Sequence, residues 1–214
     1  MNSKVTAKNK TSKQTSKNSY YHGDLHRVLL EAGEQELNEK GFEKFSMRGV
    51  AKRANVSHAA PAHYFTNSKG LLTALAVTGF RLFLDMQLQS QKKKEKSGMH
   101  PLVAAGLGYI EFAHSHPGMF RLMFASDKPD LEDEALHEAS CRAYEHLIEL
   151  VHGELIPSEQ LSDKQMQDVV SAWSMVHGLS HLYIAGKLPP LDTMKQEDYE
   201  ACIVGMISRV VPAK

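Results

Sequence analysis

The 214-residue sequence lacks several features of secreted and membrane proteins. Its two cysteines, Cys141 and Cys202, lie inside helical patterns without paired spacing, so we expect no disulfide framework. No run approaches 18 consecutive apolar residues, which predicts no membrane span. The first residues have no apolar stretch of the kind that a signal peptide needs. We therefore expect a cytoplasmic protein with no membrane partner.

The sequence also lacks the motifs of common enzyme classes. It has no Gly-x-Ser-x-Gly elbow, no glycine-rich phosphate loop and no Cys/His pair in a catalytic motif. We therefore predict that the protein is not an enzyme and has no cofactor.

Twelve histidines make a metal sensor the first alternative to consider. His177 and His181 have i, i+4 spacing and share a helix face, as do His137 and Cys141. No set supplies three or four ligands by spacing alone, and no HExxH motif occurs. We predict no metal site, with a metal-responsive regulator using His and Cys ligands as the alternative.

The net charge is zero, but the charges are unevenly distributed. Residues 1–70 carry twelve Lys/Arg against six Asp/Glu, and the remaining residues carry thirteen against nineteen. This asymmetry indicates a polyanion partner for the N-terminal part only. Residues 1–19 contain five lysines, no acidic residue and almost nothing to bury, so we expect a disordered basic tail. It is either a solubilising tail or cloning remnant, or an arm that contacts DNA phosphates or a minor groove.

The apolar residues recur at helical spacing, and no strand pattern is present. We predict an all-α fold of about nine helices in two parts. A helix-turn-helix, three-helix domain occupies residues 20–67, and a helical ligand-binding and dimerisation domain occupies residues 68–214. The expected helices cover about 24–40, 47–54, 58–64, 68–89, 101–115, 119–124, 130–151, 163–185 and 194–210. The expected caps are Ser46, Ser57, Asn67 or Ser68, and the Ser162 to Gln165 capping box.

Residues 47–64 have the pattern of a helix-turn-helix. Two short helices flank a turn at residues 54–57, in which Val56 is the apolar residue that fixes the angle between them. Such a turn can place the second helix in a DNA major groove, which is about 12 Å wide. Small residues and histidines on this second helix allow its backbone to come close to base edges.

The segment from Phe45 to Leu72 resembles the TetR/AcrR family of bacterial regulators. The matching features are Ser46, Val50-Ala51, Val56-Ser57, Tyr64-Phe65 and Lys69, and residues 21–25 are similar to one branch of the family. Further along the chain, W-x-x-x-H-G at residues 173–178 resembles the C-terminal domain type named for those letters. Residues 116–124 are also similar to that branch.

This helix-turn-helix departs from the family pattern at two positions. Ala62 stands where tyrosine is frequent, and Tyr64 stands where histidine is common. Pro61 lies within the first turn of the expected recognition helix, where its cost is small. The DNA-contacting residues that we predict are Ser46, Arg48, Ser57, His58, Ala59, Ala60, His63, Tyr64 and Lys69. Ser46, Tyr64 and Lys69 are expected on phosphates, and the residues from Ser57 to His63 are expected to face the groove.

The resemblance implies a homodimer that binds double-stranded operator DNA and responds to a small apolar or amphipathic ligand. It implies a repressor that the ligand releases from a palindromic operator; the second alternative is a helical interaction module without specific DNA binding. The ligand-contacting residues that we predict are Tyr109, Phe112, Phe120, Met123, Phe124, Tyr144, Trp173 and His177. The dimer-interface residues that we predict are Val169, Val176, Leu179, Tyr183, Ile203, Met206 and Ile207.

Overall fold

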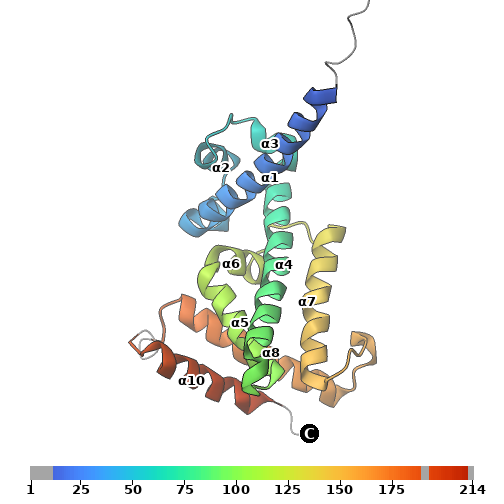
Figure 1. Ribbon diagram of the computed structural model, residues 1–214, viewed down its shortest axis with the longest axis vertical. Helices are drawn as coiled ribbons and strands as arrows, with labels where there is room; N and C mark the ends of the chain where they lie inside the picture. The colour runs from blue at the N-terminus through green and yellow to red at the C-terminus, as the bar shows by residue number, and fades with distance from the viewer. Residues whose placement is uncertain (1–11, 189–192, 212–214) are drawn as a thin grey trace, which may run out of the picture.

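The computed structural model describes residues 12–188 and 193–211, and these residues form an all-helical fold without strands (Figure 1). The nine α-helices in the described part are α1 (Ser12–Lys40), α2 (Met47–Arg53), α3 (Ala60–Phe65), α4 (Ser68–Lys94), α5 (Pro101–Ser115), α6 (Pro117–Ala125), α7 (Glu134–His152), α8 (Asp163–Ile184) and α10 (Gln196–Ile207). The short 3-10 helices are η1 (Phe42–Lys44), η2 (Glu95–Ser97), η3 (Ser158–Gln160) and η4 (Ser208–Val210). The prediction of an all-α fold with about nine helices is confirmed for these residues.

Side-chain caps define three of the helix starts that the sequence predicts. The Ser46 hydroxyl accepts a hydrogen bond from the Gly49 N–H at 3.1 Å at the start of α2. The Asn67 carboxamide accepts from the Gly70 N–H at 3.0 Å and begins α4. At the start of α8, Ser162 and Gln165 form the reciprocal capping box. Each cap satisfies an amide that the first helical turn leaves without a partner.

Helices α1 and α7 begin several residues away from the predicted positions. Helix α1 starts at Ser12 instead of residue 24, so residues 12–19 are helical where disorder was expected. A helix that is already anchored at residues 24–40 can extend without the cost of nucleation. The composition of residues 12–19 alone does not show that such an anchor follows them. The rest of the predicted tail, residues 1–11, lies outside the described residues. Helix α7 starts at Glu134 instead of residue 130, because Asp133 is its cap and accepts from the Leu136 N–H at 2.9 Å.

Helix α4 is the central column of the molecule (Figure 1). It begins at the helix-turn-helix, runs beside α5 and α7, and ends near α8 and α10. With η2 it forms the one segment in the described part, residues 68–97, that is long and apolar enough to cross a membrane. Half of its most apolar window is buried inside the fold, as in the core helix of a globular protein.

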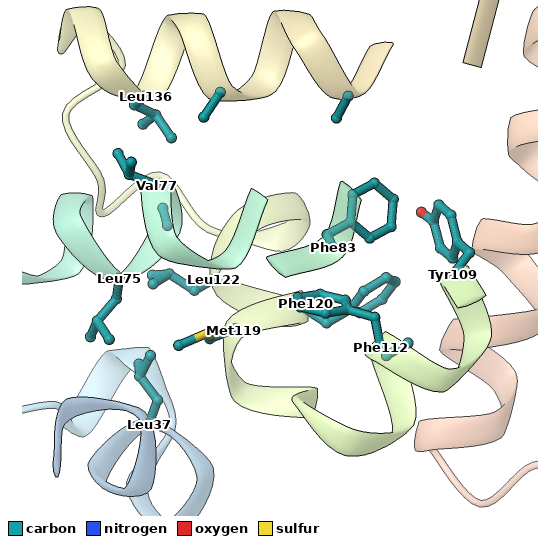
Figure 2. Packing of buried hydrophobic residues seen from close by; sticks show 14 of the residues in the cluster. Leu37, Leu75, Val77, Phe83, Tyr109, Phe112, Met119, Phe120, Leu122 and Leu136 are labelled. Carbon is teal, nitrogen blue, oxygen red and sulfur yellow. The ribbon is translucent and has the colours of Figure 1, made fainter. Parts of the chain in front are cut away.

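One hydrophobic core joins the helix-turn-helix to the rest of the chain. Leu37 of α1, Leu75 of α4 and Met119 of α6 meet where the helix-turn-helix joins the other helices, while Val77 of α4 faces Leu136 of α7 (Figure 2). All five side chains are at most 8% exposed. The buried apolar area therefore stabilises α1, α4, α6 and α7 together.

Polar contacts strengthen the joint between α1 and α6. The Asn38 carboxamide oxygen accepts a hydrogen bond from the Gly118 N–H at 2.8 Å. Beside it, His116 Nδ1 lies 2.5 Å from Glu34 Oε1. Gly118 is required here, because a Cβ at this position would lie 2.5 Å from the Asn38 oxygen. The orientation of α1 is thus fixed by a helix of the C-terminal part.

Helices α4 and α5 make their closest approach at Gly108, and a Cβ there would lie 2.6 Å from the Met86 carbonyl oxygen and 2.8 Å from Gln87 Cα. These are backbone atoms that cannot rotate away. We therefore expect Gly108→Ala to lower the free energy of unfolding by about 1–3 kcal/mol, as overpacking typically does. Urea denaturation measures this change. Glu111→Ala, at an exposed position of the same helix, is the control, and an equal effect of both substitutions would contradict the argument.

Candidate nucleic-acid interface and ligand cavity

The turn between α2 and α3 is longer than the sequence predicts. Helix α3 begins at Ala60, and its cap position is Ala59 without a side-chain hydrogen bond, so the prediction that Ser57 caps this helix is wrong. The reason is Pro61, which is favoured in the first helical turn and therefore fixes where the helix starts. Asn55, with φ of 53°, supplies the left-handed residue in the turn. Residues 54–59 thus connect the two helices.

The outer face of this turn and of α3 combines small and polar residues. Ser57, His58, Ala59 and His63 are exposed, and Ala60 is half-buried. Pro61 and Phe65 point inward and are buried. Of the other predicted contacts, Arg48 is exposed on α2, whereas Tyr64 is half-buried with its ring edge-on to His26 at 5.9 Å. The predicted groove-facing residues are therefore accessible to solvent, apart from the partly covered Ala60.

An ionic network around the buried Glu36 connects α2 to α1. Arg53 donates from Nε to Glu36 at 2.7 Å and from both terminal nitrogens to Glu39 at 2.6 Å. The Ser46 hydroxyl donates to the same Glu36 carboxylate at 3.3 Å. The hydrogen bond from Arg53 lowers the pKa of Glu39, and the two carboxylates raise the pKa of Arg53. Glu36 is only 4% exposed, so its charge depends on these donors.

Lys69, a predicted phosphate contact, is engaged within the subunit. Its Nζ lies 2.9 Å from Asp130 Oδ1, in the connection between α6 and α7. The Asp130 N–H donates to the Thr73 hydroxyl at 2.8 Å, which holds this connection against α4. The hydrogen bond from Lys69 lowers the pKa of Asp130. Both members of the pair are about half exposed, so a DNA phosphate could compete for Lys69.

A cavity of about 670 Å³ lies between α4, α5, α7, α8 and the connection from α7 to α8. Its size is in the range of small-molecule binding sites. The aromatic lining residues are Phe80, Phe83, Tyr109, Phe124, Tyr144 and Trp173. The polar lining residues are Gln87, Ser140, Cys141, Glu145, Ser158 and Glu159.

The polar groups deepest in this region bind one another. Trp173 Nε1 donates to the Tyr109 hydroxyl at 3.3 Å, and that hydroxyl lies 2.7 Å from His177 Nδ1. Burial raises the pKa of Tyr109; burial, with His181 close by, lowers the pKa of His177. The neutral imidazole is therefore favoured, and its Nδ1 can accept a hydrogen bond from the Tyr109 hydroxyl. The polar atoms of Tyr109 and Trp173 are thus engaged with one another, and these residues contribute mainly aromatic surface to the cavity lining.

The structure places four of the eight predicted ligand contacts in the cavity lining: Tyr109, Phe124, Tyr144 and Trp173. The other four, Phe112, Phe120, Met123 and His177, are not part of it. Phe112 and Phe120 are fully buried in the hydrophobic core. Figure 2 shows both rings close to Phe83 and Tyr109. His177 contacts the lining residue Tyr109, whose hydroxyl lies 2.7 Å from its Nδ1. The lining residues that the sequence analysis missed include Phe80, Phe83, Glu145 and Glu159.

Five of the seven predicted dimer contacts are buried within the subunit. Val169, Val176, Leu179, Ile203 and Ile207 are at most 7% exposed, so they have almost no surface left for a partner. Both α8 and α10 carry apolar residues on several faces, and the sequence does not show which face packs inward. Tyr183 and Met206 are half-buried and stay predictions.

A different face of α8 and α10 is open to solvent. Val170 and Leu182 of α8 are 46% and 48% exposed. Gly178 of α8 and Gly205 of α10 have no atom of the subunit within 4 Å of where a Cβ would lie. The open surface of α8 and α10, defined by Val170, Gly178, Leu182 and Gly205, thus combines exposed apolar side chains with two glycines that leave room for close backbone approach.

Histidines cluster beside the cavity without forming a set of metal ligands. The rings of His177 and His181 are 4.6 Å apart, and Cys141 Sγ lies 3.5 Å from His137 Nε2. Within residues 12–188 and 193–211, no group of three His, Cys, Asp or Glu side chains is arranged to hold a metal ion. The alternative of a metal sensor therefore gains no support from these residues.

Comparison with protein families gives two matches that together cover most of the chain. Residues 29–75 match the model of bacterial regulatory proteins of the tetR family, and residues 102–206 match the tetracyclin repressor-like C-terminal domain. The first match contains the helix-turn-helix, and the second contains α5 to α8 and most of α10. A search of curated proteins found no match.

Solved structures with the same fold include a protein of unknown function from Rhodococcus sp. RHA1, with 24% identity and a TM-score of 0.66 over 91% of this chain and 98% of that one. A TetR-like transcriptional regulator from the same organism has 13% identity and a TM-score of 0.59, covering 89% and 97%. The fatty acid degradation regulator FadR from Bacillus halodurans has 12% identity and a TM-score of 0.62, covering 88% and 99%. At these identities the likeness concerns the fold.

Proposed function

This chain belongs to the TetR family of bacterial transcriptional regulators, and on that premise we propose that it is a cytoplasmic homodimeric repressor that a small ligand releases from a palindromic operator. The protein acts by binding rather than by catalysis. The observation that carries the proposal is that Ser57, His58, Ala59 and His63 of the helix-turn-helix are exposed, while Pro61 and Phe65 anchor α3 in the core. Small residues allow the backbone to approach base edges, and the imidazoles can form hydrogen bonds with them.

Selection from random duplexes followed by sequencing tests the proposal, with binding measured over a series of salt concentrations. We expect a palindrome whose half-sites are separated by one helical turn of DNA or a multiple of it, because the two recognition helices of a dimer are related by two-fold symmetry. Substituting both His58 and His63 by alanine should weaken binding to that palindrome more than binding to random DNA. Salt-dependent binding without any enriched sequence would refute a specific regulator.

Helix α4 is the element that couples ligand and DNA. Its first turn carries Lys69 next to α3, and its middle lines the cavity with Phe80, Phe83 and Gln87. A ligand can release DNA only if it binds the non-DNA conformation more tightly. A ligand that displaces the middle of α4 would also displace its first turn, and with it the two recognition helices of the dimer.

The connection between α6 and α7 gives a second route between the cavity and the DNA interface. Helix α7 lines the cavity, and Asp130 just before it holds Lys69. We expect Asp130→Asn to raise operator affinity about two- to fivefold, because Lys69 no longer has to leave a carboxylate to reach a phosphate. Fluorescence anisotropy with a labelled operator measures this.

Asp127→Asn is the matched control for Asp130→Asn, because Asp127 lies in the same connection and its substitution changes the net charge equally. In a Lys69→Ala background, Asp130→Asn should have no effect beyond that of Asp127→Asn. An equal gain from both substitutions in the Lys69 protein would show that only the overall charge matters.

A further inference from the structure

The charges around the cavity all have one sign. Glu145 and Glu159 are its charged lining residues, and no Lys, Arg or His from the described part of the chain lines it. Both carboxylates are exposed, so they lie where the cavity opens to solvent. The opening is therefore acidic, while the interior is built from aromatic rings.

Neither carboxylate is neutralised by a basic side chain. Glu159 accepts a hydrogen bond from the adjacent Ser158 hydroxyl at 3.4 Å. No ion pair within residues 12–188 and 193–211 involves Glu145 or Glu159. Residues 131–160 contain eight acidic residues against the single basic Arg142. The potential at the opening is thus negative and attracts cations.

The aromatic interior of the cavity also favours a ligand with a positive charge. Tyr109 and Trp173 satisfy their polar atoms through each other and through His177, so these two residues offer a ligand aromatic surface rather than free polar groups. The face of an aromatic ring attracts a cation through its quadrupole. A ligand carboxylate, in contrast, would meet two carboxylates and no basic group.

We propose that the ligand is a lipophilic organic cation, with its apolar body against Phe83, Tyr144 and Trp173 and its charge near Glu145 and Glu159. This inference rests on the ligand-responsive function proposed above and names the class of ligand. The cavity volume of about 670 Å³ suits a body of several aromatic rings.

A pair of ions with nearly the same shape and opposite charge tests the proposal. Tetraphenylphosphonium and tetraphenylborate are each titrated into the full-length protein. Trp173 is the only tryptophan in the sequence and lines the cavity, so quenching of its fluorescence reports binding there. We expect saturable binding of the cation and at least about tenfold weaker binding of the anion. Equal affinity for the two ions, or tighter binding of the anion, overturns the proposal.

Substitutions of Glu145 and Glu159 test whether the bound cation lies near these two carboxylates. We expect Glu145→Gln and Glu159→Gln each to weaken tetraphenylphosphonium binding about three- to tenfold, and to leave tetraphenylborate binding equal or stronger. Glu138→Gln is the matched control, because Glu138 is an exposed residue of the same α7 outside the cavity. If Glu138→Gln weakens cation binding as much as Glu145→Gln, a general surface potential is the cause and the site is wrong.

DNA selection and cation binding, measured on the same protein, distinguish a failure of this inference from a failure of the proposed function. If it selects a palindrome from random DNA but does not bind the cation, the ligand class is overturned and the regulator stands. If it binds the cation through Glu145 but selects no DNA sequence, the cation site is supported and the proposed function fails.

Discussion

Arg53→Met should lower the free energy of unfolding by about 3 kcal/mol, because it leaves the Glu36 carboxylate buried without its ionic partner. The Glu36 side chain is 5% exposed and that of Arg53 is 20% exposed, so the expected loss is at the lower end of the range for breaking buried pairs. Methionine keeps much of the aliphatic volume of arginine, which limits the effect to the charge. Urea denaturation at pH 7 measures the change.

Glu39→Gln is the control for this prediction, since Glu39 is the exposed partner of the same arginine, with 58% of its side chain accessible. We expect a much smaller shift of the urea midpoint than for Arg53→Met. The hydrogen bond from Arg53 lowers the pKa of Glu39 below its ordinary value of 4.5, so this pair stabilises the fold above that pH and is lost as the pH falls through the lowered pKa. If Glu39→Gln costs as much as Arg53→Met, the buried charge is not the cause.

Leu182→Glu should convert the protein to monomers and weaken binding to the palindromic operator by about 100-fold, because two linked half-site contacts become independent. Leu182 is 48% exposed in the subunit, so the subunit itself should remain folded. It lies on the open face of α8 and α10 with Gly178 and Gly205, where we propose that the second subunit packs. Light scattering after gel filtration measures the mass, and anisotropy measures the DNA affinity.

The same substitution at a comparable exposed leucine separates dimerisation from a general effect of charge. Leu88 is 45% exposed on α4, outside the face of α8 and α10. We expect Leu88→Glu to remain dimeric and to bind the operator as the wild type does. A dimeric Leu182→Glu protein would place the subunit interface elsewhere.

Local signals in the sequence predicted the helices well, because a cap and the amide that it accepts from lie three residues apart. Ser46, Asn67 and Ser162 are such caps, and all three begin the helices expected of them. Ser57 has the right residue type for a cap, but Pro61 fixes the start of α3 at Ala60. Where two local signals compete, the one that restricts the backbone dihedral determines the boundary.

Contacts between distant residues limited the prediction of the sites. Arg53 and Glu36 are 17 positions apart, and Tyr109 and His177 are 68 positions apart, so neither pairing has a local pattern. An aromatic or apolar residue at helical spacing can face the core, a cavity or a partner subunit. Phe112 and Val169 face the core, whereas Trp173 faces the cavity, and only the packing of α8 against α5 and α7 distinguishes them.

The shared core limits which parts of this protein can be exchanged between regulators. Leu37 packs against Leu75 and Met119, and Asn38 accepts a hydrogen bond from Gly118. A hybrid that joins residues 1–67 of this protein to the C-terminal part of another regulator would therefore lose one partner of each of these contacts. Ser57, His58, Ala59 and His63, in contrast, are exposed and lie outside this core. Substitutions at these four positions should therefore change the preferred DNA sequence and leave the helices around the cavity in place, so the two proposed binding surfaces can evolve separately.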